Sequence, residues 1–199
     1  MNLLKMNSPL YRSVLFSALL ALGGCSAYTA QNPGNALSPV NAMATPQHDR
    51  VMLKGADLVN YFKNGTYQQG SPEFSENLEG VSFYFVSAEN KAAFQQNPSG
   101  YLPQYGGYCA NGITYGIPWG GDADAFKIVN GKLYIFGGAF SKDAFELNEA
   151  KNIELADQYW AQEVKGRNSF IQRAKRLVFR VPHYQSGEDL AKALAAAKR

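Results

Sequence analysis

Cysteine, histidine and long apolar runs are all scarce in this 199-residue chain. Two cysteines exclude a small domain held together by disulfides, and two histidines leave little for a structural zinc site, which needs four Cys, His or carboxylate ligands. No apolar run approaches the roughly 20 residues of a membrane-spanning helix. The hydrophobic content of 46% excludes a disordered chain, so we expect one soluble domain with appendages.

A catalytic set of residues is missing as well. His48 and His183 lie outside the segment with the strongest structural signals, so that segment has no evident general base and no serine–histidine–acid arrangement. Gly137-Gly138 lacks the spacing and the strand–helix context of a nucleotide-binding loop. We therefore expect a protein that is not an enzyme and that binds a ligand or a partner.

Residues 1–24 have the pattern of a bacterial export signal. Lys5 and Arg12 precede an apolar stretch at 14–22, which is too short to span a membrane comfortably. The next residues, Leu22-Gly23-Gly24-Cys25, resemble a lipoprotein signal box. This resemblance implies cleavage before Cys25 and attachment of a diacylglycerol, which carries fatty acids such as palmitate, to its sulfur. An ordinary secretory signal that ends near a cysteine is the alternative.

The residue after the cysteine indicates where such a lipoprotein resides. Aspartate at this position tends to retain lipoproteins in the inner membrane, and this chain has Ser26 there. The resemblance therefore implies an outer-membrane lipoprotein held on the periplasmic face by its lipid anchor. That compartment excludes nucleic acid as a partner. Cleavage removes two of the 19 basic side chains and leaves 17 against 16 acidic ones, so the net charge says little about partners.

Composition divides the mature chain into three parts. Residues 25–50 are rich in Ala, Asn, Gln, Ser, Thr and Pro and carry almost no charge, which predicts a flexible tether. Aromatic residues and periodic signals extend from 51 to 165 and predict a folded module. Residues 166–199 form a basic extension with 8 basic and 2 acidic side chains.

The first half of the module contains both helix and strand signals. A short helix is expected at 56–64, with Asp57 as a cap. The alternation at 80–86 predicts a strand, which leads into a helix at 88–96 capped by Ser87.

The second half has the strongest local signal in the chain. Asn130-Gly131 joins the strand-like runs 125–129 and 132–136, which predicts a two-residue β-hairpin. Residues 141–164 have a helical pattern with a break near Lys151-Asn152. Together these elements predict an α+β fold with a short antiparallel sheet and packed helices.

Several motifs follow one another in a fixed order through the module. They are Gly70-Ser71-Pro72-Glu73-Phe74-Ser75, the run from Phe83 to Asn90 with Phe94 and Asn97-Pro98, Pro103-Gln104-Tyr105-Gly106-Gly107-Tyr108-Cys109-Ala110, Asp122, Ala125, Asn130-Gly131-Lys132-Leu133-Tyr134 and Trp160. This succession resembles the exported branch of the YHS-domain family over about residues 51–165. The resemblance implies a small α+β unit. Relatives in the broader group bind metal through paired cysteines, where this chain has Val86 and Asn90.

Cys109 is the most distinctive candidate for a functional residue. If Cys25 is lipidated, Cys109 is the only free thiol in an oxidising compartment. One interpretation makes it a small buried hydrophobic residue. The others make it a ligand for copper or another soft metal ion, a redox-active thiol, or one half of an intermolecular disulfide.

The turn before Cys109 is the candidate ligand-binding segment. Gly106 and Gly107 stand between Tyr105 and Tyr108 and either expose backbone N–H groups to a ligand or permit tight packing, which we favour. Aromatic side chains between 61 and 136 supply either a pocket for an apolar or planar ligand or the hydrophobic core.

The basic extension predicts two helices. The first begins at Asn168 or Ser169, ends at Pro182 and has an apolar stripe opposite its basic residues; the stripe consists of Phe170, Ala174, Leu177, Val178 and Val181. The second begins at Ser186, with Asp189 in a capping box. We expect the stripe to dock on the module. The alternative is contact of residues 167–180 with anionic lipid or with an envelope protein.

Overall fold

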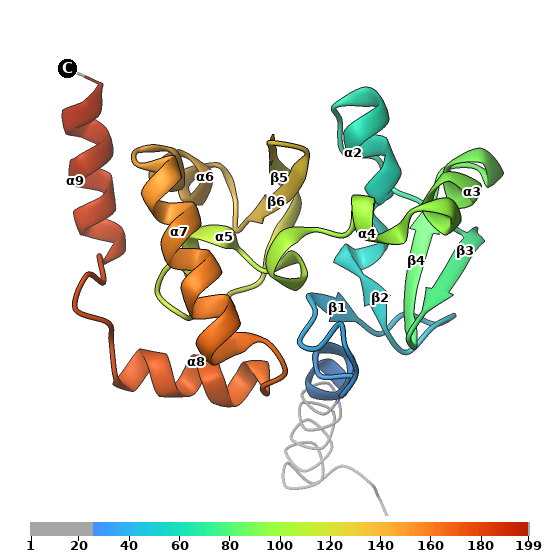
Figure 1. The fold of residues 1–199 in the computed structure, drawn as a ribbon, viewed down its shortest axis with the longest axis horizontal. Helices are drawn as coiled ribbons and strands as arrows, with labels where there is room; N and C mark the ends of the chain where they lie inside the picture. The colour runs from blue at the N-terminus through green and yellow to red at the C-terminus, as the bar shows by residue number, and fades with distance from the viewer. Residues whose placement is uncertain (1–25, 199) are drawn as a thin grey trace, which may run out of the picture.

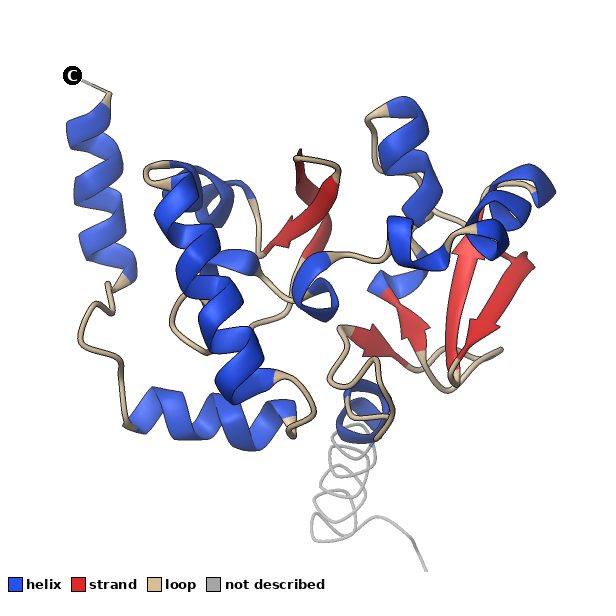
Figure 2. Cartoon of the chain, in the orientation of Figure 1, coloured by secondary structure: helices blue, strands red, loops and turns tan. Residues whose placement is uncertain are grey.

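The computed structural model describes residues 26–198, which adopt an α+β fold (Figures 1 and 2). Its strands are β1 (Ala42–Met43), β2 (Val51–Met52), β3 (Ser71–Leu78), β4 (Val81–Phe85), β5 (Asp122–Val129) and β6 (Lys132–Phe136). Its helices include α2 (Leu58–Asn64), α3 (Ala88–Gln96), α4 (Pro98–Tyr101), α5 (Ala110–Ile113), α6 (Ala139–Glu146), α7 (Glu149–Tyr159), α8 (Ser169–Val178) and α9 (Gly187–Ala197). Short turns of helix are η1 (Leu53–Gly55), η2 (Gln104–Gly107) and η3 (Trp160–Val164).

The strands form two separate sheets. The first has the order β1–β2–β4–β3, with β2 parallel to β4 and the other neighbours antiparallel. The second is the antiparallel hairpin β5–β6. No helix within residues 26–198 is long and apolar enough to cross a membrane. The export signal and Cys25 lie outside the described residues.

The capping and turn signals of the sequence are confirmed. The carboxylate of Asp57 accepts hydrogen bonds from the first turn of α2, and the hydroxyl of Ser87 caps α3. Asn130 and Gly131 have φ angles of 51° and 74°, as a two-residue hairpin requires. The break expected near Lys151-Asn152 is present but lies a few residues earlier: α6 ends at Glu146 and α7 begins at Glu149, because Asn148 adopts a non-helical conformation.

The described chain contains one structural unit twice, which the sequence analysis did not detect. Each unit consists of a turn, a helix, a β-hairpin and two further helices, and corresponding elements lie 51 positions apart: η1 and η2, β3 and β5, β4 and β6, α3 and α6. Even the bulge is repeated, because Ser71 pairs with Phe85 and Asp122 pairs with Phe136 before the register shifts. Figure 1 shows the two units side by side.

Two main clusters of buried side chains correspond to the two units. The first lies between α2, α3 and the four-stranded sheet; its largest members are Tyr61, Phe83, Phe85 and Phe94. The second lies between β6, α5, α6 and α7; its largest members are Tyr108, Tyr134, Phe136 and Phe145. Phe94 and Phe145 occupy equivalent positions, which the repeat explains. Leu147, where the chain leaves α6, is 40% exposed.

Residues 26–50 are not the flexible tether that their composition predicts. Ala30, Val40 and Ala42 are each at most 3% exposed, and β1 joins the four-stranded sheet. The Asn41 amide donates to the carbonyl oxygens of Gly107 and Gly121, at 3.0 Å each. The segment is held by single buried residues and by hydrogen bonds to backbone groups. Such contacts leave no periodic apolar pattern in the sequence.

The two C-terminal helices form as predicted, but α8 docks the other way round. Its polar residues Ser169 and Gln172 are buried, whereas Leu177 and Val178 of the apolar stripe are 41% and 72% exposed. Gln172 donates from Nε2 to the carbonyl oxygen of Gly116 at 3.0 Å, so the polar face satisfies backbone groups of the module. Beyond the helix, Val181 is buried, and Ser186 and Asp189 form the predicted capping box of α9.

Removing the Asn41 amide should separate the N-terminal segment from the second unit. We expect Asn41→Ala to lower the free energy of unfolding by about 1–3 kcal/mol, because it leaves two carbonyl groups without donors. Gln68→Ala, an exposed amide in a loop, is the control and should change little. Urea unfolding of the wild type and of both variants measures these free energies. If Asn41→Ala is as stable as the wild type, residues 26–50 are not part of the cooperative fold.

The contact between α8 and η3 should depend on pH. Partial burial alone would raise the pKa of Glu163, but hydrogen bonds from Arg176, Gln172 and Lys175 outweigh it and lower that pKa below its ordinary value of 4.5. The unfolded chain therefore binds the proton more tightly, so the stabilisation is complete above pH 4.5 and is lost as the pH falls through the folded pKa. The stability difference between wild type and Glu163→Gln should shrink on acidification. A difference independent of pH would contradict this.

Candidate functional site

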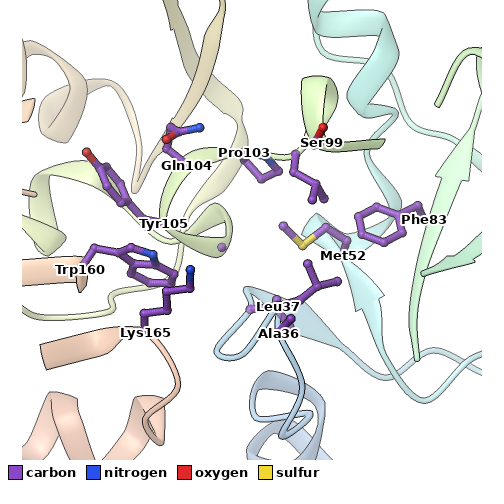
Figure 3. Close-up of a pocket in the computed structure, with 13 residues that line it drawn as sticks. Ala36, Leu37, Met52, Phe83, Ser99, Pro103, Gln104, Tyr105, Trp160 and Lys165 are labelled. Atoms are coloured by element: carbon purple, nitrogen blue, oxygen red, sulfur yellow. The ribbon is translucent and has the colours of Figure 1, made fainter. Parts of the chain in front are cut away.

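A cavity of about 230 Å³ lies where the N-terminal segment meets both units (Figure 3). Apolar and aromatic side chains form most of its wall, and Ser99, Gln104 and Lys165 add polar groups. The remaining lining residues are Ala36, Leu37, Val40, Met52, Phe83, Leu102, Pro103, Tyr105, Gly106 and Trp160. The cavity therefore combines five stretches of the chain, at 36–40, 52, 83, 99–106 and 160–165.

The η2 turn forms one side of this cavity in a strained conformation. Tyr105 has φ 55° and ψ 36°, the left-handed region, which costs a non-glycine residue about 1–3 kcal/mol. Its hydroxyl donates to Oδ1 of Asp157 at 2.9 Å, and its ring packs against Tyr134 and Trp160. Burial, and then the hydrogen bond to Asp157, raise the pKa of Tyr105, so the hydroxyl stays protonated.

The two glycines of the turn are required by packing. Gly106 and Gly107 have φ angles of 59° and 75°. A β-carbon on Gly106 would collide with the carbonyl oxygen of Pro39, and one on Gly107 would lie 2.9 Å from Cε of Met52. The packing interpretation favoured from the sequence is therefore confirmed. Gly106 also lines the cavity, so a larger residue there would change its shape.

Lys165 supplies the positive charge of the cavity. It lines the cavity together with Trp160 (Figure 3). Among residues 26–198, no hydrogen bond or ion pair engages this ammonium group. The described lining residues contain no histidine, cysteine or carboxylate. The cavity is thus suited to an apolar or aromatic group with a negative charge, and it lacks an evident general base.

The structure does not bring all five candidate residues together. Tyr105 and Gly106 line this cavity, whereas Gly107 packs on Met52. Tyr108 is fully buried, and its hydroxyl donates to the Val40 carbonyl at 2.9 Å, which makes it an anchor for the N-terminal segment. Sequence reasoning missed Trp160 and Lys165 as cavity residues, because only the folding of η3 against the turn brings them there.

Cys109 lines a different cavity, of about 350 Å³, between α5, α6 and α9. Its side chain is 3% exposed. Burial raises the pKa of its thiol, although the hydroxyl of Ser141 and the N–H groups of Asn111, Gly112 and Gly137 act against this rise. A thiol with a raised pKa is a poor nucleophile and a poor metal ligand at neutral pH.

The 51-residue repeat explains what surrounds Cys109. Because η2 is one residue longer than η1, the helix start at Cys109 corresponds to the helix start at Asp57, 52 positions earlier. The Asp57 carboxylate accepts hydrogen bonds from Val59 N, Asn60 N, Val86 N and Asn90 Nδ2. Val86 and Asn90 correspond to Gly137 and Ser141 beside Cys109. Thus Val86 and Asn90 hold a buried carboxylate in place.

Donor groups for a metal ion are sparse in the described structure. Within residues 26–198, no three His, Cys, Asp or Glu side chains are grouped closely enough to hold an ion. Copper binding through Cys109 therefore has no second strong donor beside it. Comparison with protein-family models, curated proteins and solved structures finds no match to this chain.

The thiol environment predicts slow chemical modification of Cys109. We expect iodoacetamide to alkylate it on the order of 100-fold more slowly in the native chain than in urea, because the thiolate is both buried and disfavoured. Phe140→Cys, at a position 47% exposed on the same cavity, is the control and should react quickly without urea. Mass spectrometry of the Cys109 peptide measures the rate. Equal rates in both states would assign Cys109 a reactive role.

Proposed function

We propose that this chain is a non-enzymatic, lipid-anchored YHS-type protein of the periplasmic side of the outer membrane, which binds a small anionic ligand with an apolar or aromatic body. The cavity beside η2 supports ligand binding. The export signal, Cys25 and Ser26 support the anchor and the location. The order of motifs from Gly70 to Trp160 supports the family.

The observation that carries the binding proposal is that Lys165 and Trp160 line the same, largely apolar cavity. Met52, Phe83 and Trp160 provide apolar contact area, and Gln104 can donate or accept hydrogen bonds. An unpaired ammonium group next to an aromatic wall attracts a carboxylate, sulfonate or phosphate attached to an apolar body. The volume of about 230 Å³ suits a ligand or ligand portion of modest size.

Ligand binding is preferred to metal handling for a physical reason. The strain at Tyr105 is maintained by a hydrogen bond and two ring contacts, and such strain is typical of a preorganised binding wall. Cys109 lies at the other cavity, where its thiol is surrounded by backbone groups and one hydroxyl rather than by soft donors. Metal handling and thiol redox chemistry therefore have less support than ligand binding.

The fluorescent anion 8-anilinonaphthalene-1-sulfonate matches this chemistry and serves as the probe. The chain has two tryptophans, so Trp119→Phe leaves Trp160 as the single indole. We expect the bound probe to quench Trp160 by energy transfer. Lys165→Glu should weaken binding roughly ten-fold, because it replaces attraction by repulsion.

A matched charge reversal separates this site from the general charge of the protein. Lys132→Glu changes an exposed lysine on the β5–β6 hairpin by the same two units of charge. It should leave the probe affinity unchanged. If both variants lose affinity equally, or if Trp160 is not quenched, the proposed site is wrong.

A further inference from the structure

The exposed side of α8 is an unusually apolar surface. We define the α8 face as Ile171, Ala174, Leu177, Val178 and Phe179. Ile171, Val178 and Phe179 are 65%, 72% and 68% exposed, and Ala174 and Leu177 are exposed as well. Within residues 26–198, these side chains belong to none of the buried clusters. A helix that presents such a face to water is typical of one that contacts a further surface.

The orientation of α8 is fixed by its opposite, polar side. Arg173 donates from Nη2 to the carbonyl oxygen of Pro118 at 2.7 Å, and Arg176 binds Glu163 in a salt bridge. At the helix start, Ser169 N donates to Oδ1 of Asn32 at 2.7 Å. A rotation of α8 that buried the apolar face would break these contacts. The α8 face is therefore a stable feature of the fold.

The charged residues of the segment 165–180, which contains the α8 face, have one sign. Residues 165–180 contain six basic side chains and no acidic one: Lys165, Arg167, Arg173, Lys175, Arg176 and Arg180. Arg173 and Arg176 are used in docking, and Lys175 lies 3.1 Å from Glu163. Arg180 lies over the Tyr184 ring at 4.5 Å and remains exposed. An exposed apolar strip flanked by cations is complementary to an anionic lipid surface.

The beginning of the described chain lies at the same edge of the molecule. The Tyr28 ring packs on Phe170 at the start of α8, with 5.5 Å between ring centroids. Tyr28 itself is 44% exposed. Figure 1 shows α8 along the lower edge, next to the first described residues in blue. Ser26 directly follows Cys25, so a lipid on Cys25 would attach close to the α8 face.

We propose that the α8 face lies in the headgroup region of an anionic phospholipid bilayer and fixes the orientation of the protein on the membrane. The exposed apolar side chains enter the boundary between headgroups and acyl chains, and the flanking cations contact lipid phosphates. The closeness of a lipid to the α8 face rests on the proposed anchor at Cys25. The exposure of the α8 face and the cations beside it do not depend on that anchor.

Depth-dependent quenching in vesicles tests this contact with the full chain. A solvent-sensitive fluorophore is attached through Val178→Cys, at a position exposed enough for the substitution to leave the fold intact. Glu188→Cys, on the exposed side of α9, is the matched control. The unsubstituted chain reports background labelling. The chains are reconstituted in phosphatidylglycerol–phosphatidylcholine vesicles that contain a nitroxide-labelled lipid.

We expect the label at 178 to be quenched roughly three-fold more than the label at 188 and to shift its emission to the blue, because only the α8 face enters the lipid. Phosphatidylcholine vesicles or high salt should reduce this difference, since the cations then lose their partners or are screened. Flotation of the chain with the vesicles reports membrane attachment separately.

Each other outcome overturns the proposal. A chain that floats but shows equal quenching at both positions is attached without using the α8 face, so this proposal fails and the anchor stands. A chain that does not float with the vesicles contradicts both the α8 contact and the anchor. The emission of the label at 178 can also shift to the blue without quenching, by an amount that grows with the protein-to-lipid ratio. That result assigns the α8 face to a contact with a second copy of the chain instead.

Discussion

The contact between residues 39–41 and the η2 turn is the constraint on which the rest of the structure depends. Asn41 N donates to the Gly106 carbonyl at 2.8 Å, and its side chain binds the carbonyls of Gly107 and Gly121. Backbones approach this closely only because Gly106 has no β-carbon. The same turn connects the two units and aims Tyr105 at Asp157. The cavity is the space that remains beside this contact.

The repeat shows how one framework supports two different local environments. At the start of α2 the donors surround a carboxylate, and at the start of α5 equivalent positions surround a thiol. A buried carboxylate needs all of its hydrogen bonds, whereas a thiol needs few, so the second place tolerates Gly137 and Ser141. The second unit also packs helices α8 and α9 against itself. The two units therefore differ first in the group held at the start of the helix, which is a carboxylate in the first unit and a thiol in the second.

Local signals in the sequence predicted the local structure well. The helix caps Asp57, Ser87 and Ser186 and the Asn130-Gly131 turn act on backbone groups a few residues away, so these local effects are readable without the fold. The cavity was only partly predictable. Tyr105 and Gly106 stood out by their motif, but Trp160 and Lys165 reach them through α7 and η3. The periodicity of 51 residues was the missed signal, since it would have placed η2 at the start of a second unit.

The failures at residues 26–50 and at α8 share one physical cause. Predictions from composition and periodicity assume that apolar faces point inward. Backbone carbonyl groups of the module also need hydrogen-bond donors, just as apolar surface needs to be removed from water. Gln172 and Arg173 satisfy the carbonyls of Gly116 and Pro118, and losing each such bond would cost about 1–3 kcal/mol. Exposing an apolar side chain costs a similar amount, about 1.5–3 kcal/mol. In water, the cost of leaving the carbonyl groups without donors nearly equals the cost of exposing the apolar side chains. Against lipid, the observed orientation of α8 avoids both costs.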